Sequence, residues 1–155
     1  MPLQNQLETH PFLKGLSPQH LRALASCASE MHVEKDQFVI KEGAPADNSY
    51  LVLKGRVELE VYVASRGGVP VEAVESGGVI GWSWLMSDNN WHFDARALEA
   101  THLIALDGKR MRALCQENPM LGYELLKRYM PIIQHRLESL RWHLLEQFAG
   151  TVITR

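Results

Sequence analysis

Cysteine is scarce in this 155-residue sequence, which holds only Cys27 and Cys115. Neither cysteine belongs to a CxxC pair, and neither is joined to a histidine at the spacing of metal ligands. This pattern excludes a zinc ribbon and a four-cysteine iron–sulfur site within one chain. We therefore expect a reduced, cytoplasmic setting, and we interpret both cysteines as packing residues rather than redox sensors.

The sequence also lacks a strong net charge and a long apolar run. Its 16 basic and 18 acidic side chains are scattered and give a formal net charge of -2, so the basic footprint of nucleic-acid-binding proteins is missing. No segment approaches the roughly 18 uninterrupted apolar residues of a membrane span, and the first residues lack the pattern of a secretion signal. We predict a cytoplasmic protein that neither contacts DNA directly nor enters a membrane.

Signatures of catalysis are missing as well. We find no nucleophile–base pair, no paired carboxylates and no phosphate-binding loop, and we predict that the chain is not an enzyme. The composition does offer apolar mass, with 46% hydrophobic and 22% charged residues. That is enough to bury a core within the usual length of one domain.

The chain begins with a helical signal and then turns to strand signals. Ser17 is a helix cap and Pro18 suits the first helical position, which predicts a helix running to about Ser29. From residue 31 to 107, short β-branched and aromatic runs alternate with glycine-rich turns, the pattern of a small antiparallel sandwich or jelly roll. The clearest strand is 57–63, whose four aliphatic residues share one face that we expect to line the interior.

Helical patterns return after Asp107. Residues 108–116 fit a short helix, and Asn118 with Pro119 begins a long helix that ends near Ala149 and Gly150. The long helix carries an apolar stripe with the 4-3-4-3-4 spacing of a two-stranded coiled coil, which predicts a homodimer. The members of this stripe are Leu126, Met130, Ile133, Leu137, Leu140 and Leu144.

This order of elements resembles the cyclic-nucleotide-binding domain of the catabolite-activator and FNR-like superfamily. Three segments carry the resemblance: HPFLKGLSPQHLRALA, KEGAPADNSYLVLKGRVEL and ALEATHLIALDGKRMRALC. The resemblance implies an α+β fold, in which a β jelly roll is flanked by an N-terminal helix and a long C-terminal dimerisation helix. We expect a single domain over residues 1–155, with N-terminal helices in 1–30, the roll in 31–107 and C-terminal helices in 108–150.

The phosphate-binding cassette of that family is altered here. The matching segment is Gly81, Trp82, Ser83, Trp84 and Leu85, followed by Trp91 and His92. Trp82 stands where the family has the glutamate that holds the ribose hydroxyl, and Trp91 stands where it has the arginine that pairs with the cyclic phosphate. Because an indole cannot neutralise a phosphate, we predict that the chain does not bind cAMP in the ordinary way.

Two other arginines are candidates to replace the missing phosphate partner. Arg96 would require a register shift that reverses which side chains face the core. Arg136 and Leu137 fall near the place where the family's long helix contacts the base, so we expect a contribution from them to the pocket. Which arginine substitutes is left open at this point.

The contents of the pocket have three interpretations, of which residual binding of a cyclic or similar nucleotide is one. The three tryptophans of the cassette can fill the old cavity as core residues. Alternatively, a helix starting near Ser83 can direct free N–H groups toward a different, unidentified small ligand, with hydrogen bonds from Ser83 and His92. No cofactor is predicted.

Seven histidines raise a haem or metal interpretation, because some relatives of this superfamily are haem sensors. No two of them have ligand spacing on one helix face, so we predict no metal site and keep a haem or redox sensor as an alternative. His92 is the pocket candidate among them.

The expected function is that of a stand-alone, homodimeric sensor or regulatory domain. Only Thr151–Arg155 follow the long helix, where the family's regulators continue into a helix-turn-helix domain. We therefore expect signalling through protein contacts, with a structural adaptor as the alternative. Relatives with such a tryptophan-rich cassette resemble proteins that accompany redox enzyme subunits such as hydrogenases, which implies a partner of that kind.

Overall fold

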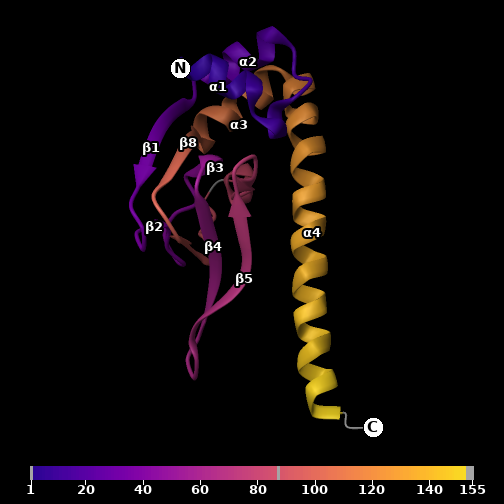
Figure 1. The fold of residues 1–155 in the computed structure, drawn as a ribbon. Helices are drawn as coiled ribbons and strands as arrows, with labels where there is room; N and C mark the ends of the chain where they lie inside the picture. Colours follow the sequence, from indigo (N-terminus) through magenta and orange to yellow (C-terminus); the bar gives the residue numbers. More distant parts are fainter. Residues whose placement is uncertain (1, 87, 153–155) are drawn as a thin grey trace.

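A computed structural model describes residues 2–86 and 88–152 of the chain (Figure 1). Two short helices, α1 (Leu3–Thr9) and α2 (Pro18–Ala25), are joined by the 3₁₀ turn η1 (Pro11–Leu13). Ser17 Oγ caps α2 by accepting a hydrogen bond from the N–H of His20 at 3.1 Å. The predicted end of this helix near Ser29 is wrong, because Ala28–Val33 form a strand that pairs along its whole length.

The middle of the described chain forms two four-stranded antiparallel sheets, in the orders β1-β8-β3-β6 and β2-β7-β4-β5. The two sheets and their flanking helices confirm the predicted jelly-roll fold. The strands are β1 (Ala28–Val33), β2 (Phe38–Ile40), β3 (Asn48–Lys54), β4 (Arg56–Val63), β5 (Gly67–Glu75), β6 (Val79–Ile80), β7 (Asp94–Ala97) and β8 (Thr101–Asp107).

The strand predicted most clearly, 57–63, lies within β4 but is buried over only part of its length. Val57 and Leu59 are buried in the roll, whereas Val63 is 40% exposed. The β4–β5 hairpin extends away from the helical end of the roll (Figure 1). Its distal end therefore has no opposite sheet to cover the aliphatic face, although the alternation along the strand is regular.

Two apolar clusters hold the roll and its helices together. The roll interior is lined by one face of β3, with Tyr50 and Val52, and by Leu103 of β8. The opposite faces of the same strands, with Leu51 and Ile104, pack beneath the helices. Because both faces of this sheet are covered, β3 and β8 are apolar on successive residues instead of alternating.

The C-terminal part consists of α3 (Gly108–Glu117) and α4 (Pro119–Val152). Asp107 Oδ1 caps α3 by accepting a hydrogen bond from the N–H of Arg110 at 3.1 Å. Figure 1 shows α4 as a long rod that runs beside β5 and continues beyond the end of the roll. No helix within the described residues combines the length and the apolar character that crossing a bilayer requires.

A buried hydrogen bond joins α4 to the sheet. Tyr129 on α4 is 1% exposed, and its hydroxyl lies 2.6 Å from Ser49 Oγ on β3. Burial raises the pKa of Tyr129 above its ordinary value, so the hydroxyl keeps its proton. Two to three turns further along α4, Arg136 and Leu140 face strands β4 and β5 of the roll.

Candidate ligand pocket

A small cavity of about 190 Å³ lies between the roll and α4. Strands β4 and β5 contribute an aliphatic wall, the segment after β6 contributes polar and aromatic side chains, and α4 covers the top. The lining residues are Leu59, Val61, Val71, Trp82, Ser83, His92, Phe93, Arg136 and Leu140. We call this cavity the roll pocket.

Trp91, which the resemblance predicts to stand at the position of the family's phosphate-binding arginine, does not line the roll pocket. It is 3% exposed and packs inside the roll, with its ring edge-to-face against Phe93 at a centroid distance of 5.7 Å. Gly81 has a φ of +94°, and a Cβ at that position would lie 2.5 Å from Trp91 Cη2. The lack of a Cβ at Gly81 therefore lets the backbone pack closely against the indole ring of Trp91.

Trp84 also lies outside the roll pocket. It is fully buried beneath the helices, with its ring 5.5 Å from the ring of Tyr129. Leu85 is half-buried and packs against the same helical cluster. Trp84 and Leu85 thus anchor the segment after β6 to the helical cluster. The preceding residues, Trp82 and Ser83, form part of the pocket wall.

Trp82, Ser83 and His92 are the cassette residues that the structure places in the pocket wall. The helix expected to start near Ser83 is the single 3₁₀ turn η2 (Ser83–Leu85). So short a turn aligns too few peptide dipoles to hold an anion by itself. A helical turn thus starts at Ser83 as expected, and the direction of its free N–H groups toward a ligand stays a prediction.

Arg136 supplies the positive charge of the roll pocket. Only 7% of the residue is exposed, and its guanidinium carbon lies 4.8 Å from the centre of the Trp82 ring and 5.7 Å from that of Phe93. Its Nε pairs with Glu72 Oε2 on β5, and His135 Nε2 lies 3.5 Å from the other oxygen of the same carboxylate. Stacking on two rings holds this cation in place, and Glu72 already balances its charge.

The other two candidates from the sequence point away from the pocket. Arg96 lies on the outer face of β7, where Glu60 Oε1 and Asp36 Oδ1 are each 2.8 Å from its guanidinium nitrogens. The hydrogen bond to Glu60 raises the pKa of Arg96 further above its ordinary value. Leu137 is 67% exposed on α4. Of the two arginines considered, the geometry favours Arg136.

Comparison with known proteins identifies the fold family. The sequence model of one protein family, the cyclic nucleotide-binding domain, matches residues 30–118, which is more than half of the chain. The chain belongs to this family. A cGMP-dependent protein kinase, egl-4 of Caenorhabditis briggsae, is 29% identical over 122 residues, which make up 79% of this chain and 15% of the kinase. The chain thus spans about one seventh of the curated kinase that it matches.

Solved structures show the same fold. A cyclic nucleotide-binding domain from Methylobacillus flagellatus KT superimposes with a TM-score of 0.79 at 21% identity, over 92% of this chain and 83% of that one. The catabolite activator protein of Thermus thermophilus superimposes with a TM-score of 0.70 at 22% identity, over 88% of this chain and 63% of that one. The resemblance found in the sequence is confirmed at the level of the fold.

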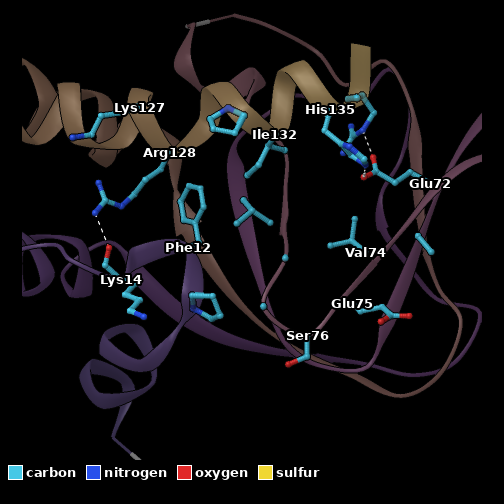
Figure 2. A pocket seen from close by; sticks show the side chains of 17 residues that line it. Phe12, Lys14, Glu72, Val74, Glu75, Ser76, Lys127, Arg128, Ile132 and His135 are labelled. Carbon is cyan, nitrogen blue, oxygen red and sulfur yellow. Dashed lines mark hydrogen bonds and ion pairs between the residues drawn. The ribbon is translucent and has the colours of Figure 1, made fainter. Parts of the chain in front are cut away.

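This cyclic nucleotide-binding domain has a second, larger hollow that the sequence did not indicate. An open groove of about 750 Å³ runs between α4 and β5. Figure 2 shows Lys127, Arg128 and Ile132 along its α4 wall, with Val74 on the facing strand. The Arg128 guanidinium donates hydrogen bonds to Glu124 Oε2 at 2.6 Å and to the carbonyl oxygen of Lys14 at 2.8 Å. The groove reaches the roll pocket at Arg136, whose side chain lines both.

The apolar stripe of α4 is largely uncovered in the single chain. Ile133 is half-buried against the helical cluster. The other members are between 44% and 67% exposed, and these are Leu126, Met130, Leu137, Leu140 and Leu144. A contiguous exposed patch of this kind is typical of a protein interface.

Burial determines the protonation state of three titratable side chains outside the pocket, Cys27, Cys115 and His10. Burial raises the pKa of both thiols, Cys27 and Cys115, which keeps them protonated and unreactive. His10 is 3% exposed, accepts a hydrogen bond at Nδ1 from the N–H of Phe12 and donates from Nε2 to the carbonyl of Val52. Burial lowers the pKa of His10, so its ring is neutral and fully engaged.

Proposed function

We propose that this domain is a sensor or regulatory module that does not respond to cAMP or cGMP and that passes its signal on through protein contacts. The ion pair between Arg136 and Glu72 is the observation that carries the proposal. A cyclic phosphate needs an unbalanced positive charge in the pocket, and it would meet the Glu72 carboxylate together with Arg136. Removing an anion from water without such a partner costs several kcal/mol.

The size of the roll pocket supports the same conclusion. Its volume of about 190 Å³ is smaller than the range of roughly 300–1,000 Å³ typical of small-molecule sites. Trp91 occupies interior volume that an arginine and a phosphate would share. A compound much smaller and less polar than a nucleotide fits the remaining space, between Trp82, Phe93 and the aliphatic wall.

A structural adaptor is the second candidate function, and Trp91 favours it. An indole at 3% exposure stabilises the roll whether or not a ligand binds. The two functions differ in one observable: a sensor is stabilised by its ligand, because a compound that binds only the folded state raises its stability.

Substitution of Glu72 by glutamine tests whether Arg136 is the pocket's anion-binding group. The change removes the balancing charge at nearly constant size, so we expect a small aromatic anion such as benzoate to raise the melting temperature of Glu72→Gln more than that of the wild type. About 2–4 °C is expected for each kcal/mol of stabilisation. Neither cAMP nor cGMP should shift the wild type, as measured by differential scanning fluorimetry.

The matched control is Glu75→Gln, on the same strand and paired at the surface with Arg56 at 3.2 Å. Equal responses to benzoate in the wild type, Glu72→Gln and Glu75→Gln would contradict the role of Arg136. A pocket that no compound stabilises in any of the three proteins would support the adaptor instead.

We also propose that the domain is a homodimer formed through α4. Two copies of the stripe Leu126 to Leu144 can interlock, because a heptad seam is complementary to itself. The helix of 34 residues is about 51 Å long at 1.5 Å per residue, so it offers apolar surface beyond the end of the roll. A dimer along α4 would place Arg136, one residue from Leu137, beside the interface. Ligand binding in the roll pocket and subunit contact would then be coupled.

A further inference from the structure

A cluster of metal-ligating side chains lies on the other sheet, away from the roll pocket. His32 on β1 and His102 on β8 are directly opposite each other, with ring centroids 4.1 Å apart and 13° between the ring planes. Glu30 lies two residues before His32, on the same face of β1. Its carboxylate oxygen is 3.8 Å from His102 Nε2, and one donor atom from each of the three residues lies within 4.8 Å of the other two.

We propose that Glu30, His32 and His102 bind a divalent transition-metal ion of the zinc class. Two imidazole nitrogens and one carboxylate oxygen are a zinc donor set that leaves a fourth position for water. Ligand atoms about 2.0–2.1 Å from a tetrahedral zinc ion are roughly 3.4 Å apart. Because Glu30 and His32 are exposed, we expect rotation of their side chains to bring the donors to that separation.

A second observation points to a missing ligand at this place. His102 Nε2 is shielded from solvent and has no hydrogen-bond partner within the described part of the chain. A buried polar atom without a partner is costly, and native structures contain few of them. A metal ion held between the three side chains would supply the partner that this nitrogen lacks.

The position in the sheet indicates what the ion does. Among the residues that the structure describes, β1 is the edge strand of its sheet and pairs with β8 alone. An ion shared by His32 and His102 ties the edge strand to its neighbour, so metal binding stabilises the folded domain. The cluster contains no residue of the roll pocket, and the proposal is independent of the function proposed above.

The test uses the full chain, purified without an affinity tag and titrated with Co²⁺ and then with Zn²⁺. We expect one Co²⁺ per chain with the visible absorption of a tetrahedral site, displacement by Zn²⁺, and a rise in melting temperature with Zn²⁺. His32→Ala and His102→Ala should each weaken binding by about tenfold or more, and Glu30→Gln should weaken it as well. His143→Ala, an exposed histidine on α4 outside the cluster, should bind like the wild type.

Circular dichroism of each variant shows whether it is folded, and Glu30→Gln, at an exposed position, provides the readout if His102→Ala is not. Failure of the wild type to bind millimolar Co²⁺ would overturn the proposal. Unchanged Zn²⁺ affinity in both His32→Ala and Glu30→Gln would overturn it too, because the ion would then be held elsewhere.

Discussion

Leu137→Glu combined with Leu144→Glu is expected to convert the protein from a dimer to a monomer in sedimentation experiments. Both side chains are exposed in the single chain, at 67% and 58%, and both belong to the heptad stripe of α4. In the dimer each glutamate would be buried without a partner, which costs several kcal/mol. We expect the dimer dissociation constant to rise at least about 100-fold, equivalent to about 2.7 kcal/mol.

The choice of positions separates association from folding. Ile133, also in the stripe, packs against the helical cluster of its own chain, so a charge there would destabilise the monomer as well. The control is Trp142→Glu, because Trp142 is 65% exposed and lies about 140° around the helix from Leu137, at 100° per residue. A wild-type protein that sediments as a monomer at tens of micromolar would contradict the dimer.

Trp84→Ala is expected to be the most destabilising single substitution in the cassette. The indole is fully buried beneath the helices and contacts Tyr129 edge-to-face. A Cβ added to Gly108 would lie 2.6 Å from Trp84 Cβ, so the site is tightly packed. Truncation should lower the free energy of unfolding by about 3–5 kcal/mol, the usual cost of removing a large buried aromatic side chain.

Urea denaturation followed by circular dichroism measures this effect, with every protein at one concentration because the proposed dimer would add to stability. Trp142→Ala is the matched control, since it removes the same type of side chain from an exposed position on α4 and should change stability by about 0.5 kcal/mol or less. A loss below about 1 kcal/mol for Trp84→Ala would show that this residue does not belong to the core.

Much of the fold was predictable because local signals and tertiary structure agree. Ser17 and Asn118 mark helix starts that the structure keeps, and the change from strands to helices falls at Asp107, as expected. The end of the first helix was not predictable. Ala28 and Ser29 have little strand preference of their own, and only their pairing with β8 makes them extended.

The cassette could be predicted only in part. The resemblance to the family predicts that its glutamate and arginine positions hold Trp82 and Trp91 here, but no sequence pattern indicates in which apolar cluster each indole packs. Trp84 and Trp91 are seven residues apart in the chain and pack in different cores, one beneath the helices and one inside the roll. The backbone of this segment includes a left-handed φ at Gly81, and the final placement of each indole depends on packing against segments distant in the chain.

Pairs from distant segments left no signal in the sequence. Glu72 and Arg136 meet because β5 is an edge strand beside α4, and His32 meets His102 through the register of β1 on β8. The helical pattern alone would place a charged residue such as Arg136 at the surface, and only the resemblance to the family predicted its contribution to the pocket. His32 and His102 do not have the short helical spacing of metal ligands, because they come from strands that are distant in the sequence.

Calorimetric titration of cAMP into the wild-type protein tests most directly whether the roll pocket has lost its nucleotide site. With Trp91 inside the roll and Arg136 balanced by Glu72, we predict no binding stronger than a dissociation constant of about 100 μM, or about -5.5 kcal/mol. Binding of cAMP at low micromolar concentration would contradict this account. It would mean that Arg136 leaves Glu72 to meet the phosphate.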